Sequence, residues 1–247
     1  MLSQKSTRRD RIILDSRETT LGLLTSSDGI MPMTIKKQAY ELIKDAILYR
    51  RLKEGVIYSQ DAICNELKIS RTPVREALLE LQQEGYVSIM RGKGIEVVPV
   101  TRKRAKDIVE ARYYLELNGS RLAALRRTED QLSAMRELWE QLKRKSIHSD
   151  VRTSYQLDRQ FHRAIFSATG NSWMQEEIEK LRDNFLRVET QSAFSNPQQA
   201  MEVVSEHEKI LLAIQAGDPD SAEAAMKKHL DKTAKRTVNH LAVDLTL

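Results

Sequence analysis

One aspartate and three histidines in the C-terminal half of the chain have the residue types and helical spacing of metal ligands. His162 follows Asp158 by four residues, which places both on one face of a helix. Phe161 and Ile165 share that face, so the pair is expected to point into an apolar interior. A carboxylate in such an interior is costly unless it is paired or bound to a metal ion.

The other two histidines lie on apolar helical faces of their own. His207 shares its face with Ile210 and Ile214, and His229 shares its face with Met226. Helical bundles commonly assemble metal sites from facing helices, and an Asp/His₃ set suits Zn²⁺, Ni²⁺ or Mn²⁺ with positions left open. A hydrogen-bonded core residue is the commoner role of a single histidine, so the spacing alone leaves that alternative open.

Composition favours a helix-rich chain. Of the 247 residues, 40% are apolar and 30% charged, with only 9 Gly and 5 Pro. The formal charge of +5 is compatible with a polyanionic partner, although an ordinary basic surface explains it equally well. The single cysteine, Cys64, excludes an intrachain disulfide and is expected to be a buried filler. The sequence contains neither a long apolar run nor a secretory signal, so we expect a cytoplasmic protein.

Periodicity divides the chain into three parts. Residues 1–33 show no sustained period and are expected to be a flexible extension, with a DNA-contacting arm as the alternative. Residues 34–100 predict three helices followed by a β-hairpin. Residues 101–247 show only helical patterning, with breaks that define about six helices. The predicted fold class is mainly α, with an N-terminal winged helix–turn–helix and a C-terminal all-α helical bundle.

The third predicted helix carries side chains that suit DNA at its start. Ser70 is a suitable N-cap, and Gly85 ends the helix. Arg71 and Arg75 are one turn apart and lie away from the expected buried face, and an arginine can grip a guanine edge or a phosphate with two hydrogen bonds. Thr72 adds a hydroxyl group. Two arginines alone are equally consistent with a solvated helix face. The apolar positions expected on the buried face are Val74, Leu78 and Leu81.

A β-hairpin with a basic tip is predicted directly after this helix. Residues 86–89 and 95–98 are β-prone, and Arg91-Gly92-Lys93-Gly94 separates them. In a winged helix–turn–helix the third helix enters the major groove, and the basic tip would reach a neighbouring groove or the backbone.

One run in the third helix is close to a known family signature. It reads Ser70-Arg71-Thr72-Pro73-Val74-Arg75-Glu76-Ala77-Leu78 and is followed by Leu81, Glu84 and Gly85. The stretch from about Lys36 to Val100 therefore resembles the GntR family of transcription regulators. The resemblance implies DNA contacts from the third helix and from the hairpin tip, namely Ser70, Arg71, Thr72, Arg75, Arg91, Gly92 and Lys93.

Two departures from the family pattern affect these contacts. Asp61 stands where some members place a DNA-contacting arginine, and an acid there cannot hold a phosphate. The hairpin tip also lacks the Pro-Asn-Arg sequence that is common in the family.

The segments around the aspartate and the histidines carry a second likeness. They are Asp158-Arg159-Gln160-Phe161-His162, Ala168-Thr169-Gly170-Asn171, Glu206-His207-Glu208-Lys209-Ile210 and Ala224-Ala225-Met226-Lys227-Lys228-His229-Leu230. They resemble the ligand-binding domain of the FadR-type subgroup, called FCD, in which an aspartate and three histidines often hold a divalent metal. The resemblance implies a metal site, with zinc expected first and nickel or manganese as alternatives, at Asp158, His162, His207 and His229.

The same resemblance implies that the helical domain senses a small organic acid. Arg112 lies in a run, Glu110–Glu116, that resembles the opening helix of this domain, and its guanidinium would clamp a carboxylate. Arg182 and Arg187 are weaker candidates, and a surface salt bridge is the alternative for all three arginines. His148 and His240 lack an apolar stripe and are expected at the surface.

Together these features predict a sequence-specific transcription regulator, in its expected mode a repressor, that binds an inverted-repeat operator as a homodimer. A metabolite carboxylate bound in the helical domain would change operator affinity. The alternatives are a regulator that senses the metal itself, a metalloenzyme that activates water at an open site, and a metal that only stiffens the bundle. No general base or nucleophile stands out beside the four ligands, so we do not predict an enzyme.

Overall fold

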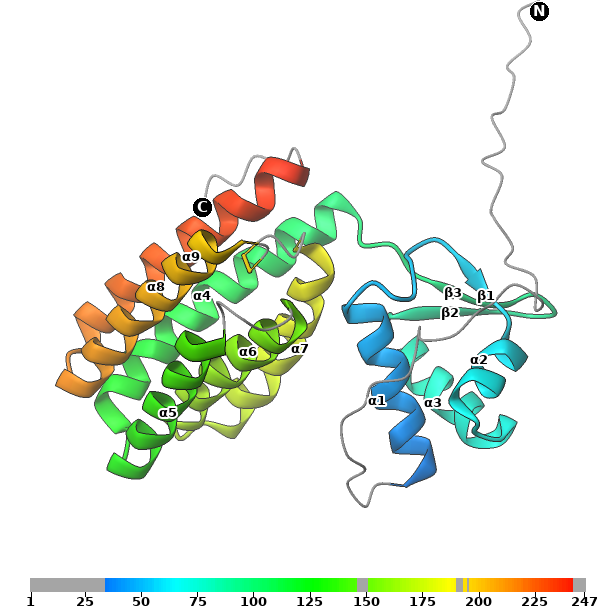
Figure 1. The fold of residues 1–247 in the computed structure, drawn as a ribbon, viewed down its shortest axis with the longest axis horizontal. Helices are drawn as coiled ribbons and strands as arrows, with labels where there is room; N and C mark the ends of the chain where they lie inside the picture. Colours follow the sequence, from blue (N-terminus) through cyan, green and yellow to red (C-terminus); the bar gives the residue numbers. More distant parts are fainter. Residues whose placement is uncertain (1–33, 146–150, 190–192, 195, 242–247) are drawn as a thin grey trace, which may run out of the picture. The chain divides into compact units, whose positions relative to one another are not determined.

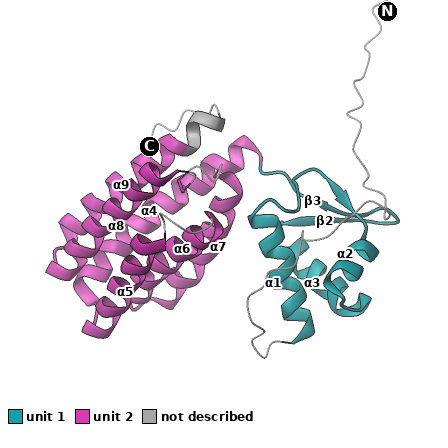
Figure 2. Cartoon of the chain, in the orientation of Figure 1, with its two compact units in different colours: residues 1–100 teal, residues 101–247 magenta. Residues whose placement is uncertain are grey.

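The chain forms two compact units, residues 1–100 and 101–247 (Figure 2). The structure, a computed structural model, describes residues 34–145, 151–189, 193–194 and 196–241. The expectations for the extension 1–33 and for His148 therefore lie outside the described residues. His240 belongs to a described helix, but its side chain is outside the described part of the chain.

The first unit has three helices and a small antiparallel sheet, which is the predicted winged helix–turn–helix (Figure 1). Its elements are α1 (Ile35–Leu48), β1 (Ile57–Tyr58), α2 (Gln60–Leu67), α3 (Arg71–Gln83), β2 (Val87–Met90) and β3 (Gly94–Val97). The strand order is β1-β3-β2, so β3 lies between its two neighbours. β1 was not predicted, because two residues are too few to show a period.

The predicted buried face of α3 is confirmed. Val74, Leu78 and Leu81 are completely buried, and α3 packs against α1 and α2. The helix ends just before Gly85, whose φ of +78° suits glycine. Ser70 occupies the N-cap position, but its hydroxyl makes no capping hydrogen bond. The start of α3 therefore relies on backbone geometry rather than on a side-chain cap.

The hairpin of β2 and β3 lies at the predicted position, with each strand within one residue of the predicted segment. Val87 pairs with Val97, and Met90 pairs with Gly94 across a tip that contains Gly92. Gly94 has a φ of +116°, and a Cβ at this position would overlap the carbonyl oxygen of Tyr58 in β1. Gly94 is therefore needed for the close pairing of β1 with β3.

The second unit consists, in its described residues, of six helices, as the breaks in the sequence predict (Figure 1). They are α4 (Arg102–Arg126), α5 (Glu129–Lys145), α6 (Val151–Ser167), α7 (Ser172–Val188), α8 (Pro197–Ala216) and α9 (Pro219–Leu241). α4 packs against α6, α7, α8 and α9. A Cβ on Gly119 of α4 would lie 2.6 Å from the ring of Phe166 in α6, so glycine lets these two helices approach closely. None of the described helices is both long and apolar enough to cross a membrane.

Candidate metal centre and DNA-binding surface

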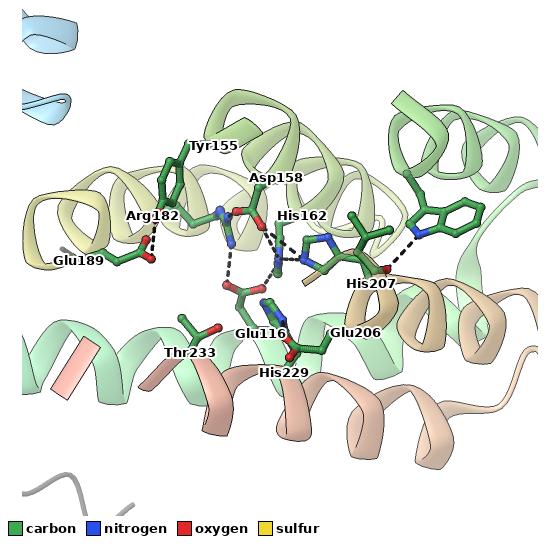
Figure 3. Close-up of polar contacts among 12 residues, drawn as sticks. Glu116, Tyr155, Asp158, His162, Arg182, Glu189, Glu206, His207, His229 and Thr233 are labelled. Atoms are coloured by element: carbon green, nitrogen blue, oxygen red, sulfur yellow. Dashed lines mark hydrogen bonds and ion pairs between the residues drawn. The ribbon is translucent and has the colours of Figure 1, made fainter. Parts of the chain in front are cut away.

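The predicted aspartate and histidines come together between three helices of the second unit (Figure 3). α6 contributes Asp158 and His162, α8 contributes His207, and α9 contributes His229. One ring nitrogen from each histidine lies within 4.8 Å of the others. The Nε2 atom of His207 lies 3.2 Å from Nε2 of His162 and 3.3 Å from Oδ1 of Asp158. The three histidines are almost completely buried.

Two buried glutamates orient two of these imidazole rings. Nδ1 of His162 donates a hydrogen bond to Glu116 in α4, and Nδ1 of His229 lies 2.8 Å from Oε2 of Glu206 in α8. An ionised carboxylate only accepts hydrogen bonds, so each Nδ1 carries a proton, which in a neutral imidazole leaves the lone pair on Nε2. Carboxylates that fix the ring and the tautomer in this way typically support metal-binding histidines.

These two glutamates were not assigned a role from the sequence. Glu206 precedes His207 directly, and Glu116 lies one turn after Arg112. The role of Glu116 could have been suspected from its position on the inward face of a helix. It falls on the same face as the buried residues Tyr113 and Ser120. Such a position is costly for a carboxylate without a partner.

The residues present fit a divalent metal ion. Nε2 of His229 is buried and has no hydrogen-bond partner among the described residues, although the centroid of the His229 ring lies 5.3 Å from that of His162 and 4.8 Å from that of His207. A buried acceptor left unpaired costs about 1–3 kcal/mol, so it requires an explanation. Three imidazole nitrogens and one carboxylate form a donor set that suits zinc and similar divalent metals. A hydrogen-bonded core histidine, the alternative role, does not account for this unpaired atom.

The local electrostatics keep the donors in metal-binding protonation states. Burial, assisted by Arg182, lowers the pKa of His162 to about 4 even though Glu116 opposes the shift. Burial and the neighbouring His229 lower the pKa of His207 well below its ordinary value. Burial alone would raise the pKa of Asp158, but Arg182 and the histidines outweigh it and hold that pKa below its usual range. Near neutral pH His162 and His207 are therefore uncharged and Asp158 is ionised.

The first unit presents the predicted DNA-contacting side chains on its surface. Ser70, Arg71, Thr72 and Arg75 are exposed at the start of α3, as are Arg91, Gly92 and Lys93 at the hairpin tip. A hollow in the surface lies at the start of α3. It is lined by Gln60, Asp61, Arg71, Thr72, Arg75, Glu76 and Leu79. The two arginines predicted to contact DNA from this helix, Arg71 and Arg75, therefore line one hollow together with the acids Asp61 and Glu76.

Both units match known families. Residues 35–97 match the family described as "Bacterial regulatory proteins, gntR family", and residues 107–232 match the FCD domain. The chain belongs to the GntR family, with an FCD domain. It is therefore a transcription regulator with a DNA-binding winged helix–turn–helix and an effector-binding helical domain. The metalloenzyme alternative is set aside, because this family and the relatives below are regulators.

Relatives and solved structures agree with this assignment over most of the chain. The Uxu operon transcriptional regulator of Escherichia coli (strain K12) is 28% identical over 222 residues, covering 82% of this chain and 86% of the relative. The Exu regulon transcriptional regulator of the same strain is 27% identical over 237 residues, covering 87% and 90%. The E. coli McbR/YncC structure has the same fold, with a TM-score of 0.76 at 23% identity, over 85% of this chain and 99% of that one.

The arginines of this GntR regulator differ in their distance from the four predicted ligands. Arg182 contacts Asp158 directly and donates to Oε1 of Glu116 at 3.1 Å (Figure 3). Nε of Arg112 donates to the same Oε1 at 2.6 Å, and its guanidinium stacks over the ring of Phe185. Arg187 is buried in α7. The surface salt bridge expected as an alternative is wrong for Arg112 and Arg182, because both ion pairs are buried.

Proposed function

We propose that this GntR regulator binds an inverted-repeat operator as a homodimer and acts as a cytoplasmic repressor. Its FCD domain holds a divalent metal, and a small organic acid that binds beside the metal changes operator affinity. The observation that carries the proposal is the buried cluster of His162, His207 and His229, in which Nε2 of His229 has no hydrogen-bond partner among the described residues.

The metal would be held by Asp158, His162, His207 and His229, with zinc as the first candidate and nickel or manganese next. When bound, it would supply open coordination positions for an oxygen of the effector. Glu116 and Glu206 hold the imidazoles of His162 and His229 in the tautomer that offers Nε2. The four side chains come from three helices, so the site also ties α6, α8 and α9 together.

The effector would be a small carboxylate, held in part by Arg182. Nε of Arg182 is buried and has no hydrogen-bond partner among the described residues, although this guanidinium already contacts Asp158 and Glu116. A buried, unpaired donor next to the metal ligands suits a carboxylate oxygen. Arg112 is the first candidate from the sequence. It would not contact the effector itself but would act indirectly, through its ion pair with Glu116.

The proposed site is connected to the DNA-binding unit through α4. That helix carries Arg112 and Glu116, and it begins at Arg102, only a few residues after β3 ends at Val97. An effector that prefers one arrangement of α4 would therefore shift the equilibrium of the DNA-binding domain, which directly precedes α4 in the chain. This change in operator affinity requires that the effector bind one arrangement of α4 more tightly than the other.

DNA contacts would come from Ser70, Arg71, Thr72 and Arg75 on α3, and from Arg91, Gly92 and Lys93 on the wing. The arginines at the start of α3 suit base reading in the major groove. The lysine on the tip suits a phosphate, since its ammonium is a compact point charge on a flexible stem.

Loss of one ligand should abolish stoichiometric metal binding. We expect His207→Ala to lose the metal, because two imidazoles and a carboxylate hold it too weakly. Glu206→Gln should weaken metal affinity by about 10–100-fold, because a neutral amide supports the His229 imidazole less well. Elemental analysis and chelator competition measure both effects. His148→Ala is the control and should retain full metal content, whereas a full equivalent of metal in His207→Ala would refute the site.

Loss of a base-reading arginine should weaken operator binding and relax sequence preference. Arg75→Ala should cost about 1–3 kcal/mol on duplexes selected by the full-length protein from a randomised library. Lys93→Ala should instead lower affinity for all duplexes alike and reduce the salt slope by about 0.9, as expected for one phosphate contact. Lys145→Ala removes an exposed positive charge from the helical unit and serves as the control. Unchanged affinity and preference in Arg75→Ala would exclude it as a base contact.

A small carboxylic acid should stabilise the metal-loaded protein. A thermal-shift screen of metabolite acids should find a ligand, and binding at a hundredfold excess over Kd would add about 2.7 kcal/mol of stability. Arg182→Met should reduce that shift. Arg121→Met should leave it unchanged, because Arg121 pairs with the exposed Asp220 and the half-buried Glu223, away from the proposed ligands. If no acid shifts the melting temperature while operator release follows metal concentration alone, the metal itself is the signal.

A further inference from the structure

An ion pair joins α2 to the start of α3 on the surface that carries the proposed DNA contacts. Nε of Arg71 lies 2.9 Å from Oδ1 of Asp61, and Nη2 of Arg71 donates to Oδ2 at 3.1 Å. The side chains remain 77% and 59% exposed. Both line the hollow at the start of α3, so the pair lies where DNA would bind.

Stability does not explain this ion pair. Exposed ion pairs typically contribute about 0–1 kcal/mol to folding, because water and salt screen them. A carboxylate on a DNA-binding surface also opposes binding, since it repels the phosphates that supply most non-specific affinity. An acid at this position is therefore expected to serve recognition rather than the fold.

The geometry of the pair determines which edge of Arg71 stays available. A guanidinium presents five N–H groups, and Asp61 occupies the edge formed by Nε and Nη2. The adjacent edge, formed by Nη1 and the second N–H of Nη2, still offers two parallel donors. Those donors match O6 and N7 of guanine. Asp61 thus leaves one pair of Arg71 donors free for a bidentate contact and fixes the direction in which that pair points.

The charge of the pair also favours a base over a phosphate. Asp61 offsets the positive charge of Arg71, so the pair as a whole attracts a phosphate weakly. Guanine presents neutral acceptors, and its recognition depends on hydrogen-bond geometry more than on net charge. The pair is therefore better suited to reading a guanine than to clamping the backbone.

We propose that Asp61 is a positioning residue that determines DNA sequence specificity by holding Arg71 in a guanine-reading orientation. This inference rests on the proposed contact between Arg71 and the operator. Asp61 lowers total affinity for DNA and raises discrimination between sequences.

The test is to select duplexes from a randomised library with full-length wild type, Asp61→Asn and Arg71→Ala. We expect wild type to enrich a guanine that Arg71→Ala no longer enriches. Asp61→Asn should lose about tenfold of that guanine preference, the range of one bidentate base contact. On a non-specific duplex, Asp61→Asn should bind more tightly, with a salt slope steeper by about 0.9, because the released Arg71 would clamp a phosphate.

Two further variants separate orientation from simple charge. Glu76→Gln removes a negative charge from the same hollow, and among the described residues no ion pair joins Glu76 to Arg71. It should raise affinity for all duplexes alike without changing the preferred bases. Asp61→Glu keeps the charge and should retain part of the guanine preference.

The outcomes distinguish this inference from the function on which it rests. If Asp61→Asn keeps the wild-type guanine preference while Arg71→Ala loses it, the role of Asp61 is overturned and the contact of Arg71 stands. If Glu76→Gln relaxes the preference as much as Asp61→Asn does, the effect is one of charge alone and the positioning role is overturned. If Arg71→Ala enriches the same sequences as wild type, the proposed contact itself fails.

Discussion

The ion pair between Arg182 and Asp158 is the interaction on which the helical unit depends most. An ionised carboxylate inside a bundle of helices is costly, and removing one partner of such a buried pair typically costs about 3–5 kcal/mol. Arg182 and the histidines together keep Asp158 ionised. Arg182 also reaches Glu116, which in turn holds His162, so the network continues into α4. The charge network thus connects Asp158, His162 and His207, and it links α6, α7 and α8 to α4, the first helix of the unit.

The hydrogen bonds that orient the histidines require two pairs of helices, α4 with α6 and α8 with α9, to pack closely. Glu116 reaches His162 because α4 and α6 approach closely at Gly119. Glu206 reaches His229 because α8 and α9 pack side by side. Each proposed ligand lies on a rigid helix rather than on a loop, which suits a site that must hold a fixed geometry. The same rigidity would let a change at the site reach the start of α4.

Much of the fold follows from patterns that a single sequence shows. Apolar spacing at Val74, Leu78 and Leu81 predicts the buried face of α3, and glycines at 85 and 92 mark the ends of regular elements. β1 could not be predicted, because its two residues pair with β3 only through long-range contacts. The hydroxyl of Ser70 does not cap α3, although its residue type suits that role, since propensity does not fix an individual hydrogen bond.

The candidate site was predicted less completely than the fold. Helical spacing placed His162, His207 and His229 on inward faces, and the structure brings them together. The roles of Glu116 and Glu206 depend on which helices are neighbours, and spacing along one helix does not contain that information. The pairing of Asp61 with Arg71 likewise joins two helices and is seen only in three dimensions.

X-ray absorption spectroscopy at the zinc edge of the zinc-loaded, full-length protein is the decisive experiment for the metal centre, because it identifies the atoms bound to the metal. We expect a first shell of nitrogen and oxygen, with three imidazoles showing Zn–N distances of about 2.0–2.1 Å and one or more oxygen ligands. A shell that contains sulfur, or fewer than two imidazoles, would contradict the proposed metal centre.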